Sequence, residues 1–295
     1  MADNIGNKPS KDYYLDVPVE TEGFFLKGLN NNDFGIKNRL SRIFNPKSKN
    51  AVVLAFDHGY IMGSTAGLER MDVTIKPLVP YVDVLMGTRG AIRSSFSPAM
   101  DQAICLRATH DASVLYDDMS IGNGAGVEME DAIRMNASAV AVQTFIGSPG
   151  ETASLETLCR YVDAGDRYGM PVLGVVAVGK QMERNAKFFL LATRILAEHG
   201  AHFIKTYYCE DFEKVTAACP VPIIIAGGKK LPEAEALSMA YRAISQGAHG
   251  VDMGRNIFQS EDPVAMAQAV GKIVHEGYTD REAYEFFQDR KRSLK

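Results

Sequence analysis

A lysine inside an apolar run is the residue whose type and setting point most directly to chemistry. Lys205 lies in the run 202–208, which has the composition of a buried strand. A buried ammonium is costly, so burial is expected to lower the pKa of this amine and free it to attack carbonyl carbons. Pairing with a carboxylate, or an amine that reaches solvent, is the alternative. The setting favours a Schiff-base lysine.

Asp57 ends the first apolar run, 51–57, and His58 follows it. Strand periodicity places Val53, Ala55 and Asp57 on one side, so Asp57 is expected to face a barrel interior at its mouth. There it either holds Lys205 or moves protons; otherwise it caps the next helix. For His58, substrate binding and stabilisation of the loop both stay open.

Glycines and an arginine stand where the last two runs end. Gly227 and Gly228 follow one run, and Gly254 and Arg255 follow the next. Glycines let backbone N–H groups approach an anion, and an arginine fork binds phosphate. Because strands seven and eight of a (β/α)8 barrel often supply a phosphate site, these residues predict one for a phosphorylated small molecule.

Other reactive side chains have plainer alternatives. Lys180 and Lys230 are basic groups near the predicted mouth, and Lys229 is expected to be a solvated loop lysine. Tyr207 and Cys209 lie close to Lys205 in the sequence. Cys209 is either an acyl acceptor or, as is commoner for a free cysteine, a small buried side chain.

The elements that position these residues form a regular alternation. Short, nearly continuous apolar runs are typical of strands buried on both faces of a parallel sheet. Helix-like stretches between them indicate an α/β fold with right-handed crossovers, and eight units favour a closed (β/α)8 TIM barrel over an open sheet. The runs are 51–57, 82–87, 103–108, 138–146, 172–178, 202–208, 222–228 and 250–254.

Helical patterns fill most of the connections, and two of them end at a glycine. Gly169 and Gly200 follow their last turns, as is common at helix C-termini. The glycine-rich stretch 117–126 is expected to be a flexible active-site loop. The predicted helices are 67–77, 128–135, 152–168, 186–198, 232–246 and 263–274.

The barrel is expected to span residues 51–275, with additions at both ends. Residues 1–50 form an N-terminal extension with a short helix at 40–44, lying on the outside or at a subunit contact. Residues 276–295 form a C-terminal helix or tail whose basic residues, Arg290, Lys291, Arg292 and Lys295, favour a solvated end over a basic anchor.

Bulk properties exclude several classes of function. A net charge of −4 and a pI near 5.9 give no sign of a nucleic-acid surface. No apolar run is long enough for a membrane span. The cysteines have no CxxC spacing, so no metal is expected, and we expect a cytoplasmic protein with reduced thiols. The cysteines are Cys105, Cys159, Cys209 and Cys219.

Together, the segments 55–59, 204–208, 226–230 and 252–258 resemble the archaeal-type class I aldolase family. The similarity is nearly end to end and includes 39–46 and 255–260. Within the family it is closest to a thiolase branch of autoinducer-2 breakdown, which moves an acetyl group from a phosphorylated five-carbon dione to coenzyme A. The resemblance implies acetyl-coenzyme A and dihydroxyacetone phosphate as products, with no metal or other cofactor.

The resemblance also implies residue roles. Lys205 matches the Schiff-base lysine, Asp57 an active-site aspartate, and Gly227, Gly228, Gly254 and Arg255 the phosphate-binding ends. It further implies a homo-oligomer, a decamer of two pentameric rings. The sequence shows no nucleotide-binding motif, so coenzyme A binding follows from the resemblance alone.

One departure separates the possible activities. Aldolases of the family carry a Tyr-Pro-Arg-Gly motif after the fifth strand, whereas residues 176–180 here contain no tyrosine. This disfavours a class I fructose-bisphosphate-type aldolase, the nearest alternative. A non-catalytic protein that binds phosphorylated sugars is the second alternative, and Lys205 argues against it because a binder needs no amine inside a strand.

Overall fold

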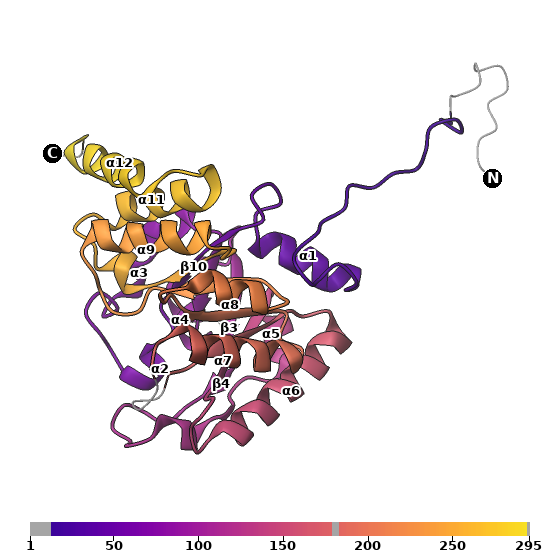
Figure 1. The fold of residues 1–295 in the computed structure, drawn as a ribbon, viewed down its shortest axis with the longest axis horizontal. Helices are drawn as coiled ribbons and strands as arrows, with labels where there is room; N and C mark the ends of the chain where they lie inside the picture. The colour runs from indigo at the N-terminus through magenta and orange to yellow at the C-terminus, as the bar shows by residue number, and fades with distance from the viewer. Residues whose placement is uncertain (1–12, 179–182, 294–295) are drawn as a thin grey trace.

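The chain folds around a closed barrel of eight parallel strands, seen in a computed structural model that describes residues 13–178 and 183–293 (Figure 1). Each strand pairs with its neighbours in chain order, and β1 closes the barrel by pairing with both β2 and β10. Every barrel strand lies within one of the eight predicted runs, which confirms the α/β (β/α)8 fold. The barrel strands are β1 (Ala51–Ala55), β2 (Val84–Gly87), β3 (Ala103–Arg107), β6 (Ala139–Thr144), β7 (Val172–Val176), β8 (Phe203–Tyr207), β9 (Ile223–Ala226) and β10 (Gly250–Met253).

Helices cover the barrel and return the chain to its N-terminal end. Gly169 and Gly200 both adopt positive φ angles after their helices, as expected for glycine C-terminal stops. The segment predicted as one helix at 67–77 is instead divided, because Pro77 opens a separate 3-10 helix. The outer elements are α2 (Gly59–Met62), α3 (Met71–Thr74), η1 (Lys76–Tyr81), α4 (Arg89–Ser95), α5 (Met129–Arg134), α6 (Glu151–Tyr168), α7 (Ala186–Glu198), α8 (Phe212–Ala218), α9 (Glu233–Ser245), α10 (Arg255–Phe258) and α11 (Pro263–Glu276).

The N-terminal end of the barrel is sealed by the segment before β1. Helix α1 (Phe34–Ile43) is longer than predicted because the Asp33 side chain caps it by accepting from the Ile36 N–H at 2.9 Å. Phe44 follows, is fully buried, and packs edge-on against Phe203, with ring centroids 5.5 Å apart. Residues 13–23 are all exposed and run away from the barrel as an extended arm (Figure 1), whereas Leu26 and Leu29 are buried against the core.

The C-terminal residues form α12 (Asp280–Ser293), which packs against α9 and α11 through the buried Ala283 and Phe287. Of the two forms expected for this segment, the structure has the helix, and Arg290 and Arg292 are exposed on it, as expected for a solvated end. Lys291 pairs there with Glu261.

The stretch predicted as a flexible active-site loop contains regular structure. After β3, β4 (Thr109–His110) pairs antiparallel with β5 (Gly124–Ala125), and η2 (Met119–Gly122) lies between them. This small hairpin is inserted between two barrel strands, β3 and β6. Along the described chain, no helix combines the length and the apolar character needed to cross a membrane.

Candidate active site

Lys205 occupies the sixth barrel strand and faces the barrel interior. Its side chain is 12% exposed, and its Nζ lies 2.9 Å from the Asp252 Oδ2 on β10. The same nitrogen lies 3.7 Å from the Met86 sulfur on β2, across the barrel. Contacts from strands on different sides place the amine within the barrel, at the level where the strands end.

The resting charge of Lys205 differs from the sequence-based expectation. Burial lowers the pKa of this amine, but the negative charges of Asp252 and Asp57 outweigh burial and hold the pKa above its usual value. The expected pKa depression was therefore wrong, and the alternative, a lysine paired with a carboxylate, is what the structure shows, because closure of the barrel brings Asp252 to Lys205. The amine rests as an ammonium ion and must lose a proton before it can attack a carbonyl carbon.

Asp252 is the most deeply buried carboxylate near Lys205. Its side chain is fully buried, and its only contact within the described residues is the ion pair with Lys205. Burial raises the pKa of Asp252 above its ordinary value, and the charge of Lys205 only partly opposes this. Asp252 is thus a carboxylate that is unusually ready to accept a proton.

Asp57 faces the same interior but has a different partner. Its Oδ2 accepts two N–H groups of Arg107 on β3, from Nε at 2.8 Å and from Nη2 at 2.6 Å. Burial raises the pKa of Asp57, but the charges of Arg107 and Lys205 and the hydrogen bond outweigh it, so the pKa is lowered. Asp57 neither caps α2 nor pairs directly with Lys205; it stays an ionised partner of Arg107.

A second layer connects Arg107 to the hairpin. The Arg107 guanidinium lies 5.3 Å from the centre of the Tyr60 ring, and the Tyr60 hydroxyl donates to Asp111. Asn123 donates to the other Asp111 oxygen at 2.7 Å. Burial, together with the Asp111 charge, raises the pKa of Tyr60, so its hydroxyl stays protonated. The hairpin therefore holds Arg107 in position from outside the barrel.

His58 is tied to the loop that follows β1. Its Nε2 lies 2.7 Å from the Thr65 hydroxyl, and its ring stacks on Phe258 at a centroid distance of 6.2 Å. Burial, with the charges of Arg255 and Lys205, lowers the pKa of His58 despite the opposing charge of Asp57. His58 thus stabilises this loop, and its lowered pKa favours the neutral imidazole.

The predicted phosphate-binding ends lie on adjacent strands, next to the strand that carries Lys205. Gly228 has a φ of +67°, and only the Tyr207 ring, at 4.0 Å, would touch a Cβ there. At Gly254 a Cβ would lie 2.2 Å from the Ala55 carbonyl oxygen, so a side chain is excluded. Arg255 is half-buried and has no carboxylate partner within the described residues.

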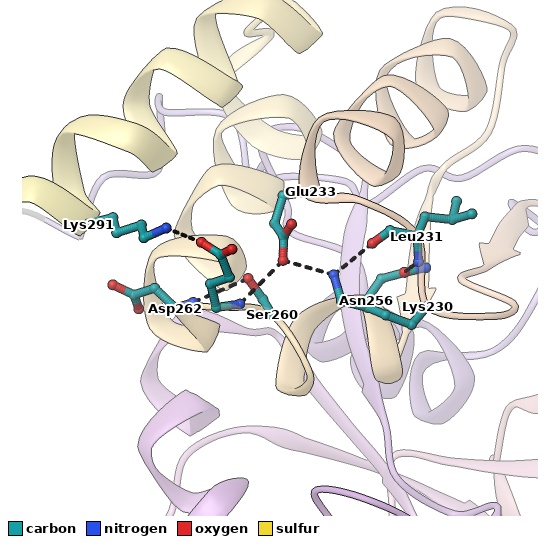
Figure 2. Close-up of polar contacts among 8 residues, drawn as sticks. Lys230, Leu231, Glu233, Asn256, Ser260, Asp262 and Lys291 are labelled. Atoms are coloured by element: carbon teal, nitrogen blue, oxygen red, sulfur yellow. Dashed lines mark hydrogen bonds and ion pairs between the residues drawn. The ribbon is translucent and has the colours of Figure 1, made fainter.

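A polar network fixes these two ends (Figure 2). The Asn256 side chain donates to the Gly227 carbonyl at 2.6 Å and accepts from the Leu231 N–H at 2.8 Å. Lys230 pairs with Glu233 at 2.8 Å, so it is not available to a ligand, whereas Lys229 is exposed as expected. The network holds the glycine-containing turns rigid.

The remaining predicted residues have simpler positions. Lys180 lies outside the described residues. Cys209 is buried, and burial with nearby acidic charges raises its pKa to about 11, so it stays a thiol and suits the structural alternative. Tyr207 faces the mouth two residues beyond Lys205, and the Arg184 guanidinium lies 4.2 Å from the centre of its ring.

Sequence reasoning missed two charged residues of the interior, Arg107 and Asp252. Each lies inside a predicted apolar strand, which is the same signal that identified Lys205. Selecting every charged residue inside a predicted apolar strand would have identified both residues. Tyr60 carried no comparable signal.

This barrel, with an amine and carboxylates at its C-terminal mouth, is the architecture of a class I aldolase. Residues 51–260 match the model of the DeoC/LacD family aldolases, and the chain belongs to that family. Within the described residues, no group of three or more histidine, cysteine, aspartate or glutamate side chains could hold a metal ion.

The curated relatives make the comparison more specific. A 3-hydroxy-5-phosphonooxypentane-2,4-dione thiolase of Klebsiella pneumoniae is 55% identical over 99% of this chain and 98% of its own length. The thiolase of the same name from Salmonella typhimurium is 53% identical over 99% of this chain and all of its own. Among solved structures, an archaeal fructose 1,6-bisphosphate aldolase has a TM-score of 0.72 and 25% identity, covering 82% of this chain and 100% of its own.

Proposed function

We propose that this chain is a thiolase that transfers the acetyl group of 3-hydroxy-5-phosphonooxypentane-2,4-dione to coenzyme A through a Schiff base at Lys205. The main support for this proposal is the position of the Lys205 amine. The side chain is 12% exposed, faces the barrel mouth and lies near two buried carboxylates, Asp252 and Asp57. The full-length identity of 55% to a thiolase of this name supports the substrate. The products are acetyl-coenzyme A and dihydroxyacetone phosphate.

The groups proposed to bind the ketone and the phosphate lie on adjacent strands, just as the ketone carbon and the phosphate-bearing carbon are adjacent in the substrate. The ketone carbon C4 lies next to C5, which carries the phosphate, and β8 with Lys205 lies next to β9 with Gly227 and Gly228. A phosphate held by these glycines, by Gly254 and by Arg255, whose guanidinium has no carboxylate partner among the described residues, would place C4 close to Lys205. Positioning of this kind lowers the barrier by fixing the reacting atoms in advance.

The Schiff base makes one carbon–carbon bond breakable. Once C4 is an iminium carbon, the thiolate sulfur of coenzyme A attacks C2, and the C2–C3 bond breaks. The bonding pair moves into the C3–C4 bond and neutralises the iminium nitrogen, which gives an enamine. A proton added to C3 and hydrolysis at C4 then release dihydroxyacetone phosphate and restore the Lys205 amine.

Asp57 and His58 have supporting roles in this proposal. Asp57, held ionised by Arg107, supplies negative charge that stabilises the iminium ion at Lys205. His58 stabilises the loop beside Arg255 and thereby the phosphate site.

The direct test is product formation with and without coenzyme A. Native protein and Lys205→Met are incubated with the phosphorylated dione, and acetyl-coenzyme A and dihydroxyacetone phosphate are measured together. We expect equal amounts of both products, strict dependence on coenzyme A, and no activity in the variant. Turnover of fructose 1,6-bisphosphate without coenzyme A would favour the aldolase alternative, and no turnover of either substrate would favour a binding protein.

We also propose that the protein is a homo-oligomer located in the cytoplasm, with the arm before α1 at a subunit contact. Leu15 is 94% exposed and Val19 is 100% exposed on this arm, which extends from the barrel (Figure 1). Exposed apolar residues of this kind mark contact surfaces. Light scattering of the native chain tests the expected decamer against a monomer.

A further inference from the structure

Two buried carboxylates lie near Lys205, and their pairing differs. Asp57 accepts two N–H groups from Arg107, at 2.8 and 2.6 Å. Asp252 contacts only Lys205, at 2.9 Å, and its second oxygen has no hydrogen-bond donor within the described residues. One carboxylate is therefore neutralised by an arginine, and the other depends on the lysine alone.

A Schiff base cannot form while Lys205 holds its extra proton. We propose that Asp252 is a catalytic residue: it takes this proton from the Lys205 Nζ and returns it to the carbinolamine oxygen as water leaves. This inference rests on the Schiff-base mechanism proposed above and assigns its proton transfers to one carboxylate.

The atoms and charges of this step balance. Asp252 becomes a carboxylic acid, and the neutral Lys205 nitrogen forms a bond to the ketone carbon while the carbonyl π pair moves to oxygen. One N–H proton passes to that oxygen, giving the carbinolamine. Asp252 then protonates the hydroxyl group, the C–O bond breaks, water leaves, and the nitrogen lone pair completes the iminium ion. Asp252 ends as a carboxylate beside a cation, as it began.

The distances allow this cycle. Asp252 Oδ2 is already 2.9 Å from the nitrogen, and the carbinolamine oxygen is only one carbon removed from that nitrogen. Complete burial favours neutral groups over charged ones, so a proton moved from Lys205 to Asp252 replaces a buried ion pair by a buried neutral pair. Burial raises the pKa of Asp252, which brings the two groups closer in proton affinity.

The other groups that face Lys205 are less suited to this role. Asp57 is engaged by Arg107, and Arg107 itself stays protonated. Burial raises the pKa of the Cys105 thiol, so Cys105 has no free anion to offer. Among the described residues, the nitrogen has one other polar contact, with the Met86 thioether, which is a weak acceptor.

The test is the rate at which borohydride traps the Lys205 adduct with dihydroxyacetone phosphate, measured from about pH 6 to about pH 11 so that the range includes the ordinary lysine pKa of about 10.4. Native protein is compared with Asp252→Asn. Removal of a proton-transfer group should lower the trapping rate at the alkaline end of this range by about 10²- to 10⁴-fold. Alkaline pH should not restore the rate, because the carbinolamine step still lacks its acid.

A purely electrostatic role predicts a different profile. Without Asp252, burial would lower the Lys205 pKa, so the rate profile would move to lower pH with an undiminished plateau, and this result would overturn the proposal. Asp252→Ser is a second variant should the Asn variant not fold, and it should show the same loss.

The matched control is Asp83→Asn. Asp83 accepts from the Val52 N–H at 2.7 Å at the opposite end of the barrel, and this variant should trap at the native rate. Trapping with dihydroxyacetone phosphate needs no coenzyme A. Failure of thiolysis therefore leaves this test intact, whereas absence of any adduct in the native protein contradicts the proposed mechanism itself.

Discussion

Replacing Arg107 by methionine should destabilise the protein strongly, because it leaves the Asp57 carboxylate buried without its partner. The two side chains are 5% and 7% exposed, and Arg107 supplies both short N–H contacts to Asp57. Removing one member of a buried ion pair typically costs about 3–5 kcal/mol. Methionine fills similar space, so the loss reports on charge rather than on a cavity.

The pH dependence of this loss has a definite sign. In the native protein the pKa of Asp57 is lowered. The ion pair with Arg107 therefore stabilises the folded state fully at any pH above the ordinary carboxyl pKa. This stabilisation is lost as the pH falls through the lowered pKa of the folded protein. Without Arg107, burial raises the Asp57 pKa, and protonation relieves the penalty as pH falls. The deficit relative to the native protein should therefore be largest near about pH 8 and shrink toward about pH 5.

Urea unfolding followed by circular dichroism at one protein concentration measures this deficit. Arg194→Met is the matched control: Arg194 pairs with Glu198 at 2.6 Å, but both are more than half exposed, and the loss should stay below about 1 kcal/mol. Asp57→Asn combined with Arg107→Met should recover part of the stability. A deficit below about 1 kcal/mol for Arg107→Met, or one that grows toward acid pH, would refute the reasoning.

Three further substitutions test other parts of the account. Phe44→Ala removes a fully buried ring that packs on Phe203 and should lower the free energy of unfolding by about 3–5 kcal/mol; a loss under about 1 kcal/mol in urea unfolding would show that the end of the barrel is not sealed there. Gly228→Ala forces a Cβ into a left-handed residue at a cost of about 1–2 kcal/mol and should raise the KM of the phosphorylated dione but not that of coenzyme A; the opposite pattern in steady-state kinetics would remove Gly228 from the phosphate site. Cys209→Ala should leave kcat and KM unchanged, since its pKa of about 11 keeps it a thiol, and loss of turnover would reinstate it as an acyl acceptor.

The barrel could be predicted from the sequence because its signals are local. Each parallel strand is buried on both faces and is therefore a nearly continuous apolar run, and Gly169 and Gly200 mark helix ends by their positive φ angles. The helices α4 and α8, with seven residues each, span only about two turns and were missed, although the six-residue α5 was predicted.

Which charged side chains pair with one another in the site could not be predicted from local signals. Asp57 and Lys205 were found because a charge at the end of an apolar strand stands out. Their partners are set by the closure of the barrel, which brings Arg107 to Asp57 and Asp252 to Lys205 across long sequence separations. For this reason the predicted direction of the Lys205 pKa shift was wrong, although its strand position was predicted.

The most direct test of the central claim is the site of covalent attachment. Native protein is treated with borohydride in the presence of dihydroxyacetone phosphate, digested, and mapped by mass spectrometry beside Lys205→Met. The account predicts a single adduct on Lys205 that is absent from the variant. No adduct in the native protein, or an adduct on another lysine, would contradict it.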